Sequence, residues 1–122
     1  RSLTLVYIDV DDFKRINDSQ GHLAGDLVLR ALADAIQKSC RDVDFACRYG
    51  GDEFCVGLPE CSAQDADLVV RRIRELFRER VDNVSLSIGV AHTGPEEFLE
   101  SEALLSAADS MMYLAKATVT RH

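Results

Sequence analysis

The chain has 122 residues, a formal net charge of −7 and a hydrophobic fraction of 47%. This length suits one domain with one core, and no apolar run approaches the ~20 residues of a membrane-spanning helix. The acidic balance argues against a nucleic-acid polymer as partner, because phosphate backbones need clusters of Lys and Arg. It allows a nucleotide carried with Mg²⁺, since the metal bridges the like charges.

The four cysteines form no C-x-x-C pair and have no His at zinc-ligand spacing. We therefore expect reduced thiols that pack as small apolar side chains. This favours a cytoplasmic domain without membrane contact of its own, although a full-length protein could carry a membrane anchor elsewhere.

The first third of the chain predicts a strand, a helical turn and a helix. Residues 3–9 are apolar and β-rich, and residues 13–17 suit a short helical turn. Gly21 and Gly25 indicate a loop. A helix is then predicted over about residues 25–38, because apolar side chains recur there at helical spacing.

Residues 44–49 and 54–58 predict the two strands of a hairpin. Gly50 and Gly51 lie between them, and a Gly-Gly pair favours tight turns that need positive φ. The adjacent acids Asp52 and Glu53 should point to opposite sides of an extended backbone. One can face a ligand while the other faces a different partner, although a solvated turn would also tolerate both acids.

The rest of the chain predicts an amphipathic helix over Ala63–Arg80, a strand over residues 84–91 and a helix over residues 104–116. The order β-α-β-β-α-β-α favours an α+β fold with a mostly antiparallel sheet and helices on one side, in ferredoxin-like order. The first strand should lie beside the hairpin in the centre of the sheet.

Acidic residues follow directly on the first strand, at Asp9, Asp11 and Asp12. Core packing explains acids at the end of a buried strand poorly, whereas a divalent cation held by oxygen ligands explains them well. The alternative is helix capping by Asp11 or Asp12. Capping accounts for one Asp and not for three.

Four sequence blocks together resemble the GGDEF family of diguanylate cyclases. In chain order they are D-x-D-x-F-K-x-x-N-D-x-x-G-H-x-x-G-D from residue 9, R-Y-G-G-D-E-F from residue 48, S-L-S-I-G-V-A from residue 85 and A-D-x-x-M-Y-x-A-K from residue 108. The resemblance implies a palm-type fold shared with nucleotidyl cyclases. It also implies condensation of two GTP molecules to cyclic di-GMP with release of two pyrophosphates.

The resemblance implies a metal site for Mg²⁺, with Mn²⁺ as the alternative. Asp9 and Asp52 would be the carboxylate ligands, and the Val10 carbonyl would add an oxygen. Glu53 would ligate a second metal ion or help to deprotonate the 3′-hydroxyl. Asp11 is expected to be structural or to support the metal ligands from outside the ligand set.

The same resemblance assigns the substrate contacts. Lys14 would meet the β- and γ-phosphates, with main-chain N–H groups near Asp12 and Phe13, and Lys116 would reach the γ-phosphate. A helix C-terminal cation is the alternative for Lys116.

Asn17 and Asp26 match the guanine contacts of the family. A helix-ending role is the alternative for Asn17, and capping in the first turn of a helix is the alternative for Asp26.

Arg41-Asp42-Val43-Asp44 fits the R-x-x-D motif through which the family binds its product at an inhibitory site. Arg41 would stack on guanine and bind phosphate, and Asp44 would accept from guanine. The alternative is an exposed loop with a weak surface ion pair.

The chain departs from the family at both ends. The usual K-x-x-G-R is altered, with Val119 and Thr120 in the last two positions, and the usual segment before the first strand is missing. We therefore expect residues 1–122 to be a GGDEF domain, truncated at its N-terminus, from a longer protein with an upstream sensory or regulatory domain. Catalysis would need a homodimer, since each chain supplies one GTP site. The alternative is a non-catalytic GGDEF domain that binds GTP or cyclic di-GMP.

Overall fold

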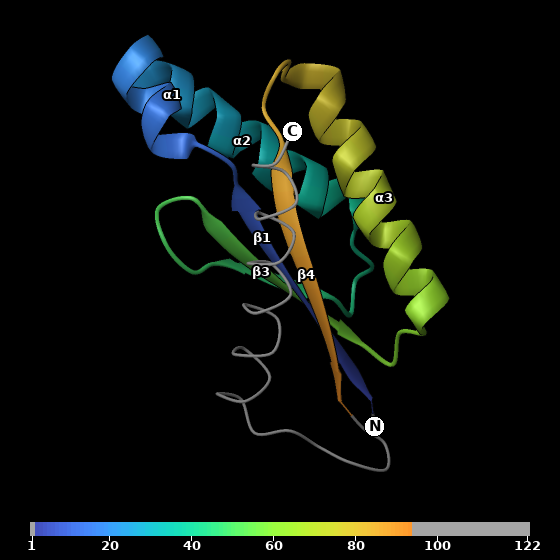
Figure 1. Ribbon diagram of the computed structural model, residues 1–122. Helices are drawn as coiled ribbons and strands as arrows, with labels where there is room; N and C mark the ends of the chain where they lie inside the picture. The colour runs from blue at the N-terminus through green and yellow to red at the C-terminus, as the bar shows by residue number, and fades with distance from the viewer. Residues whose placement is uncertain (1, 94–122) are drawn as a thin grey trace.

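The structure is a computed structural model that describes residues 2–93. It contains a four-stranded antiparallel sheet in the order β2-β3-β1-β4, with three helices (Figure 1). In chain order the elements are β1 (Leu3–Val10), α1 (Phe13–Gln20), α2 (His22–Ser39), β2 (Phe45–Arg48), β3 (Glu53–Pro59), α3 (Ala63–Arg80) and β4 (Leu86–Thr93). The α+β class and the order of these elements are confirmed. The predicted helix over residues 104–116 lies outside the described part.

β1 is an interior strand, as predicted, with β3 on one side and β4 on the other. It is buried from Thr4 to Val10, whereas all four residues of β2 are exposed. Strands that are apolar on both faces belong inside a sheet, while a short exposed strand suits an edge. The apolar pattern of residues 3–10 therefore fixes the strand that carries Asp9 in the middle of the molecule.

The main core lies between one face of the sheet and the helices α2 and α3, which cover that face side by side (Figure 1). Ile8 of β1 packs in this core with Leu32 of α2 and Ile73 of α3, all of them fully buried. A smaller buried cluster occupies the other face and includes Leu5, Tyr7 and Cys55. The alternation of β1 thus separates a helix-covered face from a second face.

The start of α2 differs from the sequence prediction. The helix begins at His22, so Gly25 lies buried inside it and does not form a loop. The reason is close packing: a Cβ on Gly25 would lie 1.9 Å from Oδ1 of Asn17. Gly21, with φ 92°, is the glycine that separates α1 from α2, as expected for a residue that tolerates positive φ.

The predicted bounds of α3 are confirmed, and a local capping signal explains why. Ser62 accepts a hydrogen bond from the Asp65 amide at 3.1 Å, which satisfies one of the free donors at the helix start. Among the described residues, no helix is long and apolar enough to cross a membrane.

Candidate active site

The end of β1 meets the hairpin turn, as the sequence predicted. Asp9 pairs directly with Glu53 in the antiparallel register of β1 and β3. The Val10 amide donates to the Asp52 carbonyl at 3.2 Å. Two acidic segments more than 40 residues apart in sequence are thus joined by main-chain pairing.

Asp9 and Glu53 project from the same face of the sheet, because directly opposed residues in an antiparallel pair share a face. Their neighbours Ile8 and Phe54 lie in the core under the helices, so the two acids occupy the other face. Asp9 is buried, at 4% exposure, and Glu53 is half-buried. The register makes Glu53 the side chain directly opposite Asp9, while Asp52 precedes it in the turn.

Tyr7 holds Glu53 in place, a contact that the sequence analysis missed. The Tyr7 hydroxyl donates to Oε2 of Glu53. The ring of Tyr7 also meets that of Tyr49 edge-on, with centroids 5.7 Å apart. The available signal was strand alternation, since Tyr7 lies two residues before Asp9 and therefore on the same face.

The hairpin turn is ordered by Arg48, which was also missed. Its Nε donates to the carbonyls of Gly50 and Gly51, each at 3.1 Å. The Tyr49 amide closes the loop onto the Glu53 carbonyl at 2.8 Å. The turn that presents Asp52 is therefore held by one guanidinium and by main-chain bonds.

The expected positive φ at the Gly-Gly pair is wrong. Within residues 2–93, Gly21 is the glycine with positive φ, and neither Gly50 nor Gly51 has it. The connection between β2 and β3 spans residues 49–52. A four-residue loop does not need the mirror-image turn that a two-residue hairpin requires.

Capping does not explain the acids after β1. Asp12 is the N-cap of α1, but its side chain makes no capping hydrogen bond and its backbone is left-handed, with φ 56°. Asp11 is buried and accepts hydrogen bonds from Ser85 and Ser87. The capping alternative is therefore wrong for both residues, and the expectation that Asp11 is structural or supports the ligands from outside stays a prediction.

The predicted ligands of a divalent cation are a mixed set of oxygen donors. In the described range, no three His, Cys, Asp or Glu side chains gather into a ligand cluster. The predicted set instead combines carboxylates from Asp9 and the hairpin with a main-chain oxygen. The Val10 amide bonds toward the turn, so its main chain lies against that acidic segment. Such hard oxygen donors suit Mg²⁺.

The predicted phosphate contacts come directly after the acidic end of β1 in the sequence. Asp12 ends the strand-to-helix link, and Phe13 and Lys14 open α1. Lys14 is exposed and Phe13 is half-buried. The first turn of α1 thus presents main-chain N–H groups and the ammonium of Lys14 next to the acidic strand end, whereas Lys116 lies outside the described residues.

Asn17 and Asp26 are brought to one place where α1 packs on α2. Asn17 lies against Gly25, the neighbour of Asp26. Asp26 is exposed and forms an ion pair with Arg30 at 3.3 Å. Both structural alternatives are wrong, because α1 continues to Gln20 and α2 begins at His22, which leaves Asp26 beyond its first turn.

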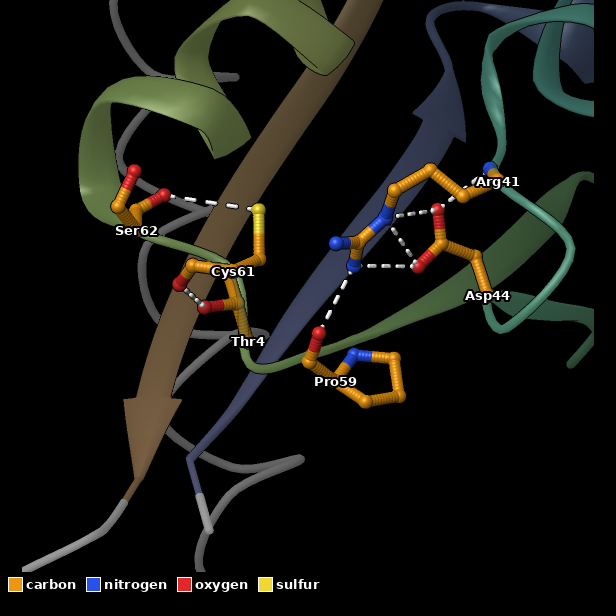
Figure 2. A network of polar contacts seen from close by, with 6 residues as sticks. All are labelled: Thr4, Arg41, Asp44, Pro59, Cys61 and Ser62. Atoms are coloured by element: carbon orange, nitrogen blue, oxygen red, sulfur yellow. Dashed lines mark hydrogen bonds and ion pairs between the residues drawn. The ribbon is translucent and has the colours of Figure 1, made fainter.

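Arg41 and Asp44 bind each other across the loop between α2 and β2 (Figure 2). The Arg41 side chain donates to Asp44 through Nη2 at 2.7 Å and through Nε at 3.1 Å, and its main-chain amide donates at 2.7 Å. Nη2 also donates to the Pro59 carbonyl at 2.8 Å. The loop is thereby fastened to the end of β3.

The ion pair joins an exposed guanidinium to a carboxylate at the end of a loop whose residues 41–43 are exposed. The Asp44 side chain is 0% exposed, while that of Arg41 is 47% exposed. Burial alone would raise the pKa of Asp44, but hydrogen bonds from the Arg41 side chain and main chain outweigh it and hold that pKa below its ordinary value. Both residues line a groove of about 490 Å³ that also touches Arg48 and Phe54 of the hairpin.

Another cavity, of about 700 Å³, lies beside α1, and of the predicted nucleotide contacts in the described residues only Asp12 lines it. It is lined by Asp12, Ile16 and Ser19 on one side and by Asn83 and Val84 on the other. Neither Asn17 nor Lys14 reaches it. Although this cavity is large, the residues that line it are therefore no reason to assign GTP to it.

Comparisons with known proteins agree with this geometry. The family model "Diguanylate cyclase, GGDEF domain" matches residues 1–122. Diguanylate cyclase A of Treponema denticola is 41% identical over 94% of the chain, and the response regulator PleD of Caulobacter vibrioides is 41% identical over 95%. The chain belongs to the GGDEF diguanylate cyclase domain family, as the sequence blocks indicated.

The solved structures give the same fold. The GGDEF domain of DgcB from Caulobacter crescentus, in complex with c-di-GMP, has a TM-score of 0.85 and 30% identity and covers 96% of this chain and 73% of that chain. Diguanylate cyclase SiaD from Pseudomonas aeruginosa, in complex with its activator SiaC, has a TM-score of 0.85 and 35% identity and covers 96% and 47%. The chain spans 33% of diguanylate cyclase A and 27% of PleD, so these relatives are much longer proteins.

The contact between Gly25 and Asn17 generates a first prediction. Gly25→Ala should gain up to about 1 kcal/mol of helix propensity but lose about 1–3 kcal/mol to overpacking. The net result is a modest loss of stability, with the Asn17 side chain displaced. Chemical denaturation and the side-chain amide signal of Asn17 in NMR spectra measure both effects.

Two controls isolate the cause. Gly51→Ala should leave the Asn17 signal in place, since a Cβ on Gly51 meets nothing within 4 Å. In an Asn17→Ala background, Gly25→Ala should become neutral or stabilising. A loss of stability that is equal in both backgrounds would contradict the packing explanation.

Proposed function

We propose that this chain condenses two GTP molecules into cyclic di-GMP and two pyrophosphates in the presence of Mg²⁺ or Mn²⁺. The observation that carries the proposal is the pairing of the Asp9 strand end with the Asp52–Glu53 turn. Relatives named as diguanylate cyclases, at 38–41% identity, support it. The activity of the longer protein to which the domain would belong is part of the same proposal.

In this reaction the 3′-oxygen of one GTP attacks the α-phosphorus of the other. A new P–O bond forms, the bond between the α-phosphorus and the bridging oxygen breaks, and pyrophosphate leaves. Asp9, Asp52 and the Val10 carbonyl would hold the cation, which when bound polarises the α-phosphate and stabilises the departing charge. The chain's own task is to position the groups and neutralise charge.

Glu53 would take one of two roles. It lies opposite Asp9, where it can complete the ligand set. Its Oε2 already accepts from the Tyr7 hydroxyl, which leaves Oε1 to take the proton of the attacking 3′-hydroxyl. A Glu53→Gln variant that keeps metal affinity but loses rate would favour the proton-accepting role.

The remaining contacts bind and orient GTP. Lys14 and the amides of Asp12 and Phe13 would bind the β- and γ-phosphates, with Lys116 adding charge by resemblance to the family. Asn17 and Asp26, brought together where α1 meets α2, offer an amide and a carboxylate that suit the edges of guanine. The site therefore accepts one nucleotide, extended from the packing of α1 on α2 to the end of β1.

A non-catalytic domain that binds GTP or cyclic di-GMP is the second candidate. Both candidates predict nucleotide binding, but only the enzyme needs the carboxylates at the hairpin turn. The intact carboxylates of Asp52 and Glu53, in the turn beside Asp9, favour the enzyme. Formation of cyclic di-GMP decides between the two candidates.

The metal carboxylates give the direct test. Asp52→Asn should abolish formation of cyclic di-GMP and leave the fold intact. The rate should fall by at least about 100-fold, as it does when a group that stabilises transition-state charge is removed. Chromatography after incubation with GTP and Mg²⁺ measures product. Asp67→Asn, an exposed acid of α3, is the matched control. Retention of most activity in Asp52→Asn would overturn the metal assignment.

Assembly of two chains gives a second test. One chain supplies one GTP site, whereas the 3′-hydroxyl and the α-phosphate that react come from two GTP molecules. We propose a homodimer with the two sites facing each other, normally promoted by an upstream domain. Specific activity of the isolated chain should then rise with protein concentration. A dimeric coiled coil fused before Arg1 should raise it further, since a tether supplies about mM effective concentration. Activity that stays flat on dilution of a monomeric chain would refute the two-chain mechanism.

We also propose that Arg41 and Asp44 bind cyclic di-GMP and inhibit the enzyme. In the described structure the Arg41 guanidinium bonds to Asp44 and Pro59. Cyclic di-GMP must therefore compete with Asp44 and Pro59 for the N–H groups of the Arg41 guanidinium. Its binding would exchange the internal contact for contacts with guanine and phosphate.

Calorimetry with cyclic di-GMP tests this site. Arg41→Ala should lower affinity by at least about tenfold, as expected for loss of a charge-assisted hydrogen bond, and relieve inhibition. Val43→Ala, an exposed residue of the same loop, should bind product like the wild type. Unchanged affinity in Arg41→Ala would reduce the motif to a structural fastening of the loop.

A further inference from the structure

Two serines at the start of β4 clamp Asp11: Ser85 directly precedes the strand, and Ser87 lies in it. Ser85 Oγ donates to Oδ2 of Asp11 at 2.5 Å, and Ser87 Oγ donates to Oδ1. The Asp11 amide also donates to the Ser85 carbonyl at 3.0 Å. Each carboxylate oxygen thus has its own hydroxyl donor, and main-chain pairing continues one residue beyond the end of β1.

The end of β1 is hydrogen-bonded on both sides, to the hairpin on one side and to the start of β4 on the other. Val10 is bonded to Asp52 on the β3 side, while Asp11 is bonded to Ser85 on the β4 side. Asp9, one residue earlier, is paired with Glu53 and with Ser87. The position of the acidic strand end is therefore set across the whole width of the sheet.

The clamp also lies next to a strained residue. Asp12 has a left-handed backbone, with φ 56°, and no side-chain capping bond. Such a conformation is unfavourable for most residues with a side chain, although Asp adopts it more often than others, and it persists where the surroundings determine it. Asp11 fixes it on one side, and on the other the Ile16 amide bonds to the Asp12 carbonyl at 3.1 Å. The strained link directs the chain from the acidic strand end into the start of α1.

Stability alone explains this network poorly. Asp11 is 9% exposed and Ser87 is fully buried, and burying a carboxylate costs free energy unless it is well compensated. Apolar residues of similar shape can replace such groups at little cost. Arg74 of α3 donates to the Leu86 carbonyl, between the two serines, at 3.0 Å. Burial lowers the pKa of Arg74, and the negative charge of Asp11 acts in the opposite direction. Asp11 therefore favours the charged form of this arginine.

We propose that Asp11, Ser85 and Ser87 form a positioning clamp that sets the cation-binding end of β1 against the phosphate-binding start of α1. The inference rests on the proposed function. The three residues are positioning residues, since they act through Asp9, Val10 and the first turn of α1.

The test compares variants that remove the serine donors with variants that keep them. Ser85→Ala combined with Ser87→Ala should lower kcat by about 10–100-fold, as for other outer partners of metal ligands, and raise the Mg²⁺ concentration needed for half-maximal rate. KM for GTP should change little. Ser85→Thr, which keeps a hydroxyl at an exposed position, should retain the wild-type rate. Ser39→Ala removes a hydroxyl that bonds within α2 and is the control for loss of a serine.

A second measurement keeps the inference separate from the enzyme activity. Calorimetry with Mn²⁺ and a non-hydrolysable GTP analogue should show about tenfold weaker cation binding in the double alanine variant, by the same precedent. Wild-type kcat and wild-type Mn²⁺ affinity in that variant, with only a lower unfolding temperature, would overturn the clamp. If the wild type binds Mn²⁺ and the analogue but makes no cyclic di-GMP, the proposed catalysis fails while the affinity comparison still decides the clamp.

Discussion

The register of β1 against β3 is the constraint on which the rest of the site depends. It places Asp9 opposite Glu53 and puts Ile8 and Phe54 into the core beneath the helices. Because side chains alternate along a strand, a slip of one residue would exchange the acidic and apolar faces. The apolar side chains of β1 thus do more than stabilise the sheet. They decide which face carries the carboxylates.

The end of β1 departs from what stability alone favours, and the departures lie within four residues. Asp9 and Asp11 are buried carboxylates, and Asp12 is a non-glycine residue with positive φ. Natural sequences conform to local structural preferences in most places and depart from them at functional sites. Positive φ also occurs at Glu60 and Asn83, but at the end of β1 it adjoins two buried carboxylates. This combination is an argument for function that is independent of the family resemblance.

Local patterns predicted what depends on neighbours in sequence. The bounds of α3 follow from its apolar spacing and the Ser62 cap, and the central place of β1 follows from its apolar run. The errors concern contacts between different structural elements, which residue type and spacing alone do not specify. Gly25 was expected in a loop, but the side chain of Asn17 requires its missing Cβ. Strand alternation puts Tyr7 on the face of Asp9, but nothing in the sequence specifies that its hydroxyl binds Glu53 or that Arg48 binds the turn.

The arrangement also explains why so short a segment can carry most of a nucleotide site. From residue 9 to residue 26 the chain runs continuously through the proposed cation ligands, the proposed phosphate contacts at the start of α1 and the proposed guanine contacts where α1 packs on α2. Local segments of this kind need little loop-closure entropy to assemble. The carboxylates of the hairpin are the exception, because they come from residues 52 and 53. The long-range pairing of β1 with β3 is therefore the step that completes the proposed site, and the clamp of Asp11 by β4 supports the same strand end from its other side.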